Sequence, residues 1–85
     1  MAKQPIRVIA AEYVKAHQIK VRFTDGTQKT VDFSAWLGGE VFRPLTSTRA
    51  FKRFFVAGGT VCWPNGADIA PETLYASKDV SAGAA

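Results

Sequence analysis

IKVRFTDGTQKTVDF (Ile19–Phe33) contains two runs in which apolar and polar residues alternate, separated by a turn sequence. In the first run Lys20 and Arg22 stand between apolar residues, and in the second run Val31 and Phe33 share a face. Alternation with a period of two is the pattern of a strand that buries one face and exposes the other. The stretch therefore predicts an antiparallel β-hairpin with its turn at TDGT.

The length of the loop decides which side chains of this hairpin face the core. A two-residue loop of Asp25 and Gly26 would place the apolar residues of the two strands on opposite faces of the sheet. A three-residue loop, residues 24–26, places them on the same face, so burial of the apolar residues selects it. This loop needs a left-handed residue at its third position, which Gly26 supplies. We expect the buried face to consist of Ile19, Val21, Phe23, Val31 and Phe33.

The remaining sequence predicts three more strands and further short helical segments. Residues 6–14 are rich in β-branched residues, and residues 54–63 form a second hairpin around two glycines. Ser34 is a candidate N-cap for a short helical turn, and the serine and threonines at residues 46–48 are candidate caps for another. The segment VFRPL, residues 41–45, is expected to be extended, because the residue before a proline avoids the helical region.

Length and composition fit a small soluble domain. The chain has 85 residues, of which 47% are hydrophobic and 21% charged, as is typical of one globular domain with a modest core. Residues 1–76 are expected to form a single α+β domain, mainly an antiparallel sheet with two or three short helices. Residues 77–85 lack periodicity and are expected to form a flexible C-terminal tail. The apolar run at residues 8–11 is too short for a signal-peptide core or a membrane span, so we expect a cytoplasmic protein.

VCWPNGADIAPETLY (Val61–Tyr75) predicts the end of a strand, a turn and the start of a helix. Trp63 closes the strand with a large apolar side chain. Pro64 suits the second position of a turn, and Asn65 and Gly66 tolerate left-handed conformations. A strand therefore ends in a tight turn at this point of the sequence.

The second half of the same stretch carries the signals of a helix start. Pro71 suits the first helical position because its missing N–H is not needed there, and Glu72 in the first turn interacts favourably with the helix dipole. Asp68 lies between turn and helix, where its carboxylate is placed to cap backbone N–H groups. Alternatively, Asn65 and Asp68 are ligands of a small molecule or a metal. The local backbone roles of both residue types favour a turn and a cap.

These segments resemble, in order and spacing, the family known as domain of unknown function 2442. The resemblance rests on VRFTDGTQKTVDFS, VFRPL and VCWPNGADIAPETLY, and it extends over nearly the whole predicted domain. The last of these, with its W-P-N-G-x-D-x-x-P-E-x-L-Y pattern, is the most specific. The resemblance implies a small bacterial α+β domain with no established activity and no catalytic residues. It also implies a gene that lies beside another small gene, in a toxin–antitoxin-like arrangement.

Residues that commonly perform catalysis or bind metals are sparse in this chain. Cys62 is the only cysteine and His17 the only histidine, so neither a disulfide within the chain nor a zinc site of Cys and His ligands is possible. Cys62 lies in an apolar strand without a nearby base, which is typical of an inert thiol. The glycine pairs match neither a phosphate-binding loop nor a dinucleotide fingerprint. We predict no enzymatic activity, no cofactor and no metal.

The charge of +4 is distributed unevenly along the chain. Residues 1–53 carry ten Lys and Arg against four Asp and Glu, whereas residues 54–85 carry one against three. Such asymmetry indicates either a surface for an acidic partner or strands whose exposed faces carry charge for solubility. The residues that we predict to contact a partner are Lys20, Arg22, Lys29, Arg49 and Arg53.

Two hypotheses of different classes fit this charge distribution. The first is a binding module that recognises another protein, as the accessory or inhibitory member of a gene pair. The second is a nucleic-acid-binding regulatory protein that uses the basic N-terminal half. The second hypothesis lacks an aromatic and basic signature and a helix long enough to fill a major groove. The sequence therefore favours a protein partner.

Overall fold

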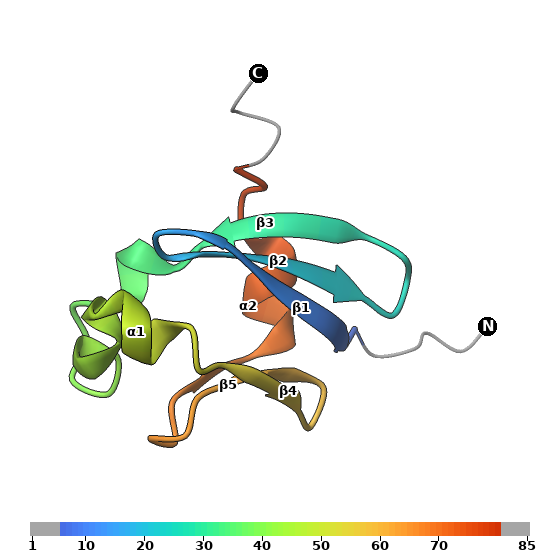
Figure 1. The fold of residues 1–85 in the computed structure, drawn as a ribbon. Helices are drawn as coiled ribbons and strands as arrows, with labels where there is room; N and C mark the ends of the chain where they lie inside the picture. Colours follow the sequence, from blue (N-terminus) through green and yellow to red (C-terminus); the bar gives the residue numbers. More distant parts are fainter. Residues whose placement is uncertain (1–5, 81–85) are drawn as a thin grey trace.

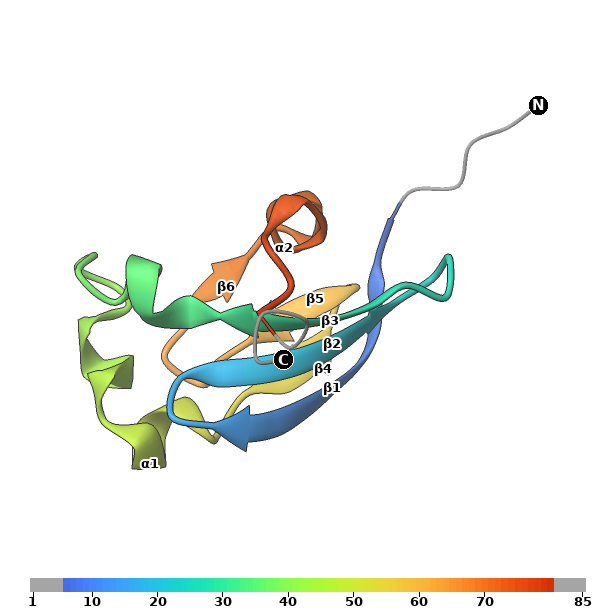
Figure 2. The same cartoon turned by 90° about the horizontal axis from the view of Figure 1, so that it is seen from above.

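Two three-stranded antiparallel sheets build the domain in this computed structural model, which describes residues 6–80. The first sheet has the order β1-β2-β3, with β1 (Val8–Lys15), β2 (Gln18–Phe23) and β3 (Gln28–Asp32). The second sheet has the order β4-β5-β6, with β4 (Phe55–Ala57), β5 (Thr60–Cys62) and β6 (Asp68–Ile69). In Figure 2 the first sheet lies over β4 and β5, so the core is enclosed between the two sheets.

Short helical segments complete the fold. They are the 3-10 helices η1 (Phe33–Trp36) and η2 (Arg43–Thr46), and the α-helices α1 (Thr48–Phe51) and α2 (Pro71–Ala76). Figure 1 shows α1 at one end of the molecule, and Figure 2 shows α2 alongside the two sheets, on the β3 side. The predicted α+β domain, mainly antiparallel sheet with short helices, is confirmed. No helix within residues 6–80 is both long and apolar enough to cross a membrane.

The hairpin of β2 and β3 has the predicted register. Ile19 lies opposite Val31, as the three-residue loop requires. The loop is closed by a hydrogen bond of 2.8 Å from the Phe23 N–H to the Thr27 carbonyl, and Gly26 has a φ of 89°. The five residues expected on the buried face are each at most 1% exposed. The alternation of apolar residues therefore determines both the loop and the face that is buried.

The turn after β5 repeats the geometry of the turn after β2. The Trp63 N–H donates to the Ala67 carbonyl at 2.9 Å, and Gly66 has a φ of 92°. The Asn65 Oδ1 accepts the Ala67 N–H at 3.1 Å, just as the Oδ1 of Asp25 accepts an N–H two residues later at 2.9 Å. Gly66 thus has the predicted left-handed conformation, and the turn directs the chain back along β5 to form β6.

Asp68 does not cap a helix, which corrects the sequence-based prediction. It lies exposed in β6, opposite Cys62 of β5, and it alternates with the buried residues Ala67 and Ile69. The N-cap position of α2 is occupied by Ala70, which makes no side-chain capping bond. The turn at Asn65 brings Asp68 into β6, where it pairs with β5 and does not reach the first turn of α2.

Two further local predictions were wrong. The N-cap of η1 is Asp32, whose Oδ1 accepts the Ser34 N–H at 2.9 Å, so Ser34 is not the capping residue. The segment around Pro44 forms η2 and is not extended. This helical turn places Leu45 in the core, at 3% exposure. Burial of one apolar side chain therefore outweighs the conformational preference of the residue before proline.

Trp63 is at the centre of an aromatic core. Its ring centroid lies 5.7 Å from those of Phe33 and Phe51, and its side chain is 1% exposed. The indole Nε1–H donates to the Phe51 carbonyl at 2.8 Å. This bond satisfies the one polar atom of a buried tryptophan, and it ties β5 to the end of α1.

The chain beyond α2 remains in contact with the first sheet as far as Val80. The Val80 N–H donates to the Thr30 carbonyl at 2.9 Å, and the Asp79 Oδ1 accepts the Thr30 N–H at 3.0 Å. Residues 77–80 of the expected tail thus cover part of the β3 edge, where they pair with backbone groups that otherwise need water. The rest of the expected tail, residues 81–85, lies outside the described residues.

Candidate functional site

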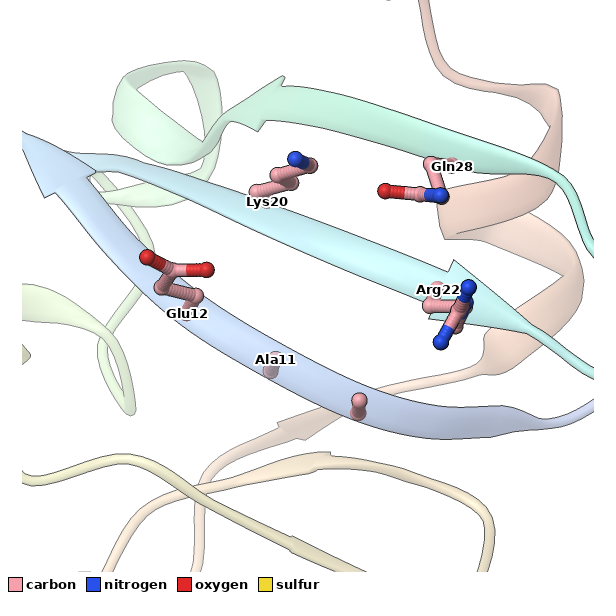
Figure 3. Close-up of a pocket in the computed structure, with 6 residues that line it drawn as sticks. Ala11, Glu12, Lys20, Arg22 and Gln28 are labelled. Carbon is pink, nitrogen blue, oxygen red and sulfur yellow. The ribbon is translucent and has the colours of Figure 1, made fainter.

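A shallow hollow of about 240 Å³ lies on the outer face of the first sheet. It is lined by Ala10, Ala11, Glu12, Lys20, Arg22 and Gln28. Figure 3 shows the long side chains of this set projecting from one side of the sheet, with α2 on the other side. Because the apolar residues of β2 face the core, the alternation sends both basic residues of β2 into this hollow.

The strand register explains both the shape and the charge of the hollow. Arg22 lies opposite Ala10 on β1 and opposite Gln28 on β3, so neither cross-strand neighbour is acidic. Lys20 lies opposite Glu12, which offsets its charge. The small side chain of Ala10 leaves the space beside Arg22 open. Arg22 is therefore the cation of this face that is best placed to meet a charge from outside.

The chemistry of the hollow favours an anion with planar oxygen acceptors. A guanidinium presents a rigid fork of donors that matches a carboxylate in a bidentate arrangement. In Figure 3 the amide of Gln28 and the ammonium of Lys20 project on the same side of the sheet as Arg22. The amide and the ammonium add further donors. None of the six lining residues is aromatic, so the hollow offers no surface on which a nucleic-acid base stacks.

The predicted partner-binding residue Lys29 has an internal role instead. Its ammonium donates to the carbonyls of Tyr75 and Ser77 and lies 5.1 Å from the centre of the Tyr75 ring. A cation at the C-terminal end of a helix satisfies the last carbonyls and interacts favourably with the helix dipole. The structure thus corrects the prediction: Lys29 fastens α2 to β3 and does not contribute to the hollow.

Arg49 and Arg53 are exposed but belong to another part of the surface. They lie in and just after α1, at the end of the molecule, whereas the hollow lies on the first sheet (Figure 1). Of the five residues predicted to contact a partner, only Lys20 and Arg22 line the hollow.

The hollow also contains residues that the sequence analysis did not single out. Ala10, Ala11, Glu12 and Gln28 come from the strands on either side of β2. Gln28 follows from the predicted register of the hairpin. The three residues of β1 do not, because irregularities near Ile9 and Val14 shift the pairing of β1 with β2.

The motif residues of the Trp63–Tyr75 stretch serve the fold. Asn65 donates through Nδ2 to the Val41 carbonyl at 3.0 Å, so its side chain joins two loops. Pro71 begins α2, and Glu72 lies in its first turn, as predicted. Within residues 6–80, no group of three or more His, Cys, Asp or Glu side chains is arranged to hold a metal ion.

Asp25 connects the first hairpin to α2. The Tyr75 hydroxyl donates to its Oδ2 at 2.6 Å, and the Thr27 N–H donates to its Oδ1 at 2.9 Å. The Tyr75 hydroxyl, followed by the Thr27 N–H, holds the pKa of the Asp25 carboxyl below its ordinary value of 3.8. Asp25 therefore acts on the fold as a carboxylate, joining two elements that are 50 residues apart.

Asp25→Asn is expected to weaken the pH dependence of stability in acid. Because the folded-state pKa lies below the unfolded value, the carboxylate stabilises the fold above pH 3.8, and this contribution is lost as pH falls through the folded-state pKa. Urea denaturation at a series of acidic pH values measures the slope. Tyr75→Phe removes the largest cause of the lowered Asp25 pKa, so it should also reduce the dependence of stability on pH. If both variants match the wild-type slope, the bond does not affect the pKa.

A comparison with protein-family models matches residues 8–79 to the family described as "Protein of unknown function (DUF2442)". The chain belongs to the DUF2442 family. The match covers nearly all of the described residues and confirms the resemblance found in the sequence. No curated protein and no solved structure shows significant similarity to this DUF2442 domain.

Proposed function

We propose that this DUF2442 domain is a non-enzymatic binding module that recognises a protein partner, as the accessory or inhibitory member of a toxin–antitoxin-like gene pair. The observation that carries the proposal is the position of Arg22, in a hollow beside Ala10 and without an acidic cross-strand neighbour. A protein that presents an Asp or Glu side chain supplies the carboxylate that this hollow fits. Lys20 and Gln28 then donate to the same or neighbouring acceptors.

The arrangement of the basic residues supports a protein partner over a nucleic acid. Nucleic-acid binders engage several phosphates along a continuous basic surface. Here Lys29 is engaged with α2, and the arginines of the α1 region lie apart from the hollow. The remaining pair, Lys20 and Arg22, matches one or two acidic side chains better than a run of phosphates.

The experiment is co-purification of the domain with the product of the adjacent gene, followed by calorimetric measurement of the Kd. Arg22→Glu reverses the charge in the hollow and is expected to weaken binding by about tenfold or more. Lys15→Glu changes the net charge equally at an exposed residue outside the hollow and is the matched control. An equal loss in the two variants would show that overall charge, and not the hollow, governs binding. An unchanged Kd in Arg22→Glu would contradict the proposed site.

The nucleic-acid alternative is tested with labelled duplex and single-stranded oligonucleotides at two salt concentrations. Neutralising several phosphates gives binding that falls with salt, with a slope of about −0.9 per phosphate for duplex DNA. Tight, steeply salt-dependent binding that is lost in Arg22→Glu would overturn the protein-partner proposal. We expect only weak binding of both oligonucleotides.

A further inference from the structure

A second depression, a cleft of about 160 Å³, lies between the η2–α1 segment and the turn after β5. It is lined by Pro44, Leu45, Ala50, Arg53, Pro64 and Asn65. Most of this lining is apolar, with one cation beside it. The contributing segments lie at the α1 end of the molecule, away from the outer face of the first sheet (Figures 1 and 2).

The walls of the cleft are held in place by the fold. Leu45 is buried in the core, and the two prolines have a restricted φ. Both polar groups of the Asn65 side chain are engaged, one with the Val41 carbonyl at 3.0 Å and one with the Ala67 N–H at 3.1 Å. A cleft that exists before its ligand arrives loses little conformational entropy on binding.

The chain segment that forms one wall of the cleft carries only positive charges. Between Glu40 and Asp68 the sequence contains no acidic residue. The basic residues of that interval are Arg43, Arg49, Lys52 and Arg53, and all four are exposed. A ligand that enters beside Arg53 therefore meets a cation and no competing carboxylate from this segment, which favours an acidic ligand.

The size of the cleft limits what it accepts. A cavity of about 150 Å³ admits a benzene molecule. A cleft of about 160 Å³ is thus matched to one large apolar side chain and is too small for several. We propose that this cleft docks an acidic peptide segment, with one leucine, methionine or phenylalanine side chain in the cleft and an adjacent carboxylate on Arg53. The site is separate from the hollow on the first sheet and does not depend on the role proposed for it.

The test is an NMR titration of the isotope-labelled domain with a short synthetic peptide in which one leucine is flanked by glutamates. We expect concentration-dependent shifts confined to residues 44–53 and 64–65. A peptide with alanine in place of leucine should bind about tenfold or more weakly, since it loses most of the buried apolar surface. A peptide with glutamines in place of the glutamates should also bind more weakly, because it lacks the charge that pairs with Arg53.

Protein variants locate the binding site. Ala50→Leu fills the cleft and should abolish the shifts, and Arg53→Glu should weaken binding about fivefold or more. Lys15→Glu is the charge-matched control and should bind as the wild type does. The alanine peptide decides the question without any protein variant, should Ala50→Leu fail to give a folded spectrum. Equal affinity for the leucine and alanine peptides, shifts centred on residues 20–22, or no shifts at millimolar peptide would each overturn the proposal.

Discussion

Replacing Trp63 with alanine is expected to lower the free energy of unfolding by about 3–5 kcal/mol, the range for truncating a buried aromatic side chain. The indole is 1% exposed and packs against Phe33, Phe42 and Phe51, so its removal leaves a large cavity. It also leaves the Phe51 carbonyl without its partner. A loss of this size is a large fraction of the stability of a domain of ordinary size. Urea denaturation followed by circular dichroism measures it.

Trp36→Ala is the matched control, because it removes the same side chain from a half-buried position on η1. Trp36 packs against Phe33 at the margin of the core, with ring centroids 5.2 Å apart, and its loss should cost clearly less. If the two variants were equally stable, Trp63 would not be the central residue of this core.

Gly26→Val is expected to destabilise the domain by about 1–3 kcal/mol, the cost of forcing a side chain into a left-handed conformation. Gly26 has a φ of 89°, and apart from Gly26 and its two chain neighbours no residue has an atom within 4 Å of the position that a Cβ would take. The cost therefore comes from the backbone and not from a collision. Thermal and urea denaturation give the change in stability, and the pairing of Ile19 with Val31 is checked by NMR.

Gly38→Val controls for the general effect of adding a β-branched residue to a loop. A Cβ at Gly38 also meets no other residue within 4 Å beyond its chain neighbours, and the φ of Gly38 lies outside the left-handed region. We expect a much smaller change than at Gly26. A Gly26→Val protein as stable as the Gly38→Val protein would mean that the loop of the first hairpin adapts without strain.

The first hairpin was predictable because local chemistry and long-range burial agree there. Strict alternation around Val21 identifies the buried face, and Gly26 identifies the loop that keeps both strands in phase. The same chemistry is present at W-P-N-G-A, where Gly66 adopts the same conformation. β6, the strand that follows this turn, was not predicted because it has only two residues, too few to show an alternation of apolar and polar side chains.

Two of the errors concern residues whose partners lie far away in the sequence. Lys29 alternates like an exposed strand residue, but its ammonium meets carbonyls 46 and 48 residues later. The segment around Pro44 forms a helical turn, and this turn buries the Leu45 side chain in the core. Neither contact can be predicted from the neighbouring sequence, because each depends on how separate helices and strands pack together.

The candidate site was predictable only along the first hairpin, which includes Gln28. Lys20 and Arg22 follow from the alternation of β2, which places both on the exposed face. The small side chain of Ala10 opens the space beside Arg22. This effect could not be predicted without the register in which β1 pairs with β2. The residues of β1 after Val8 are exposed or half-buried, so their sequence has no clear alternation that would reveal the irregular pairing.

The segment after α2 bears on how the domain behaves at high concentration. An exposed strand edge is a template on which a strand of another molecule adds, and repeated addition leads to aggregates. At Thr30 the backbone groups that such a strand would use are already bonded to Asp79 and Val80. A second molecule must displace residues 77–80 before it adds to β3 at this point. The segment therefore protects the middle of this edge against intermolecular β-aggregation.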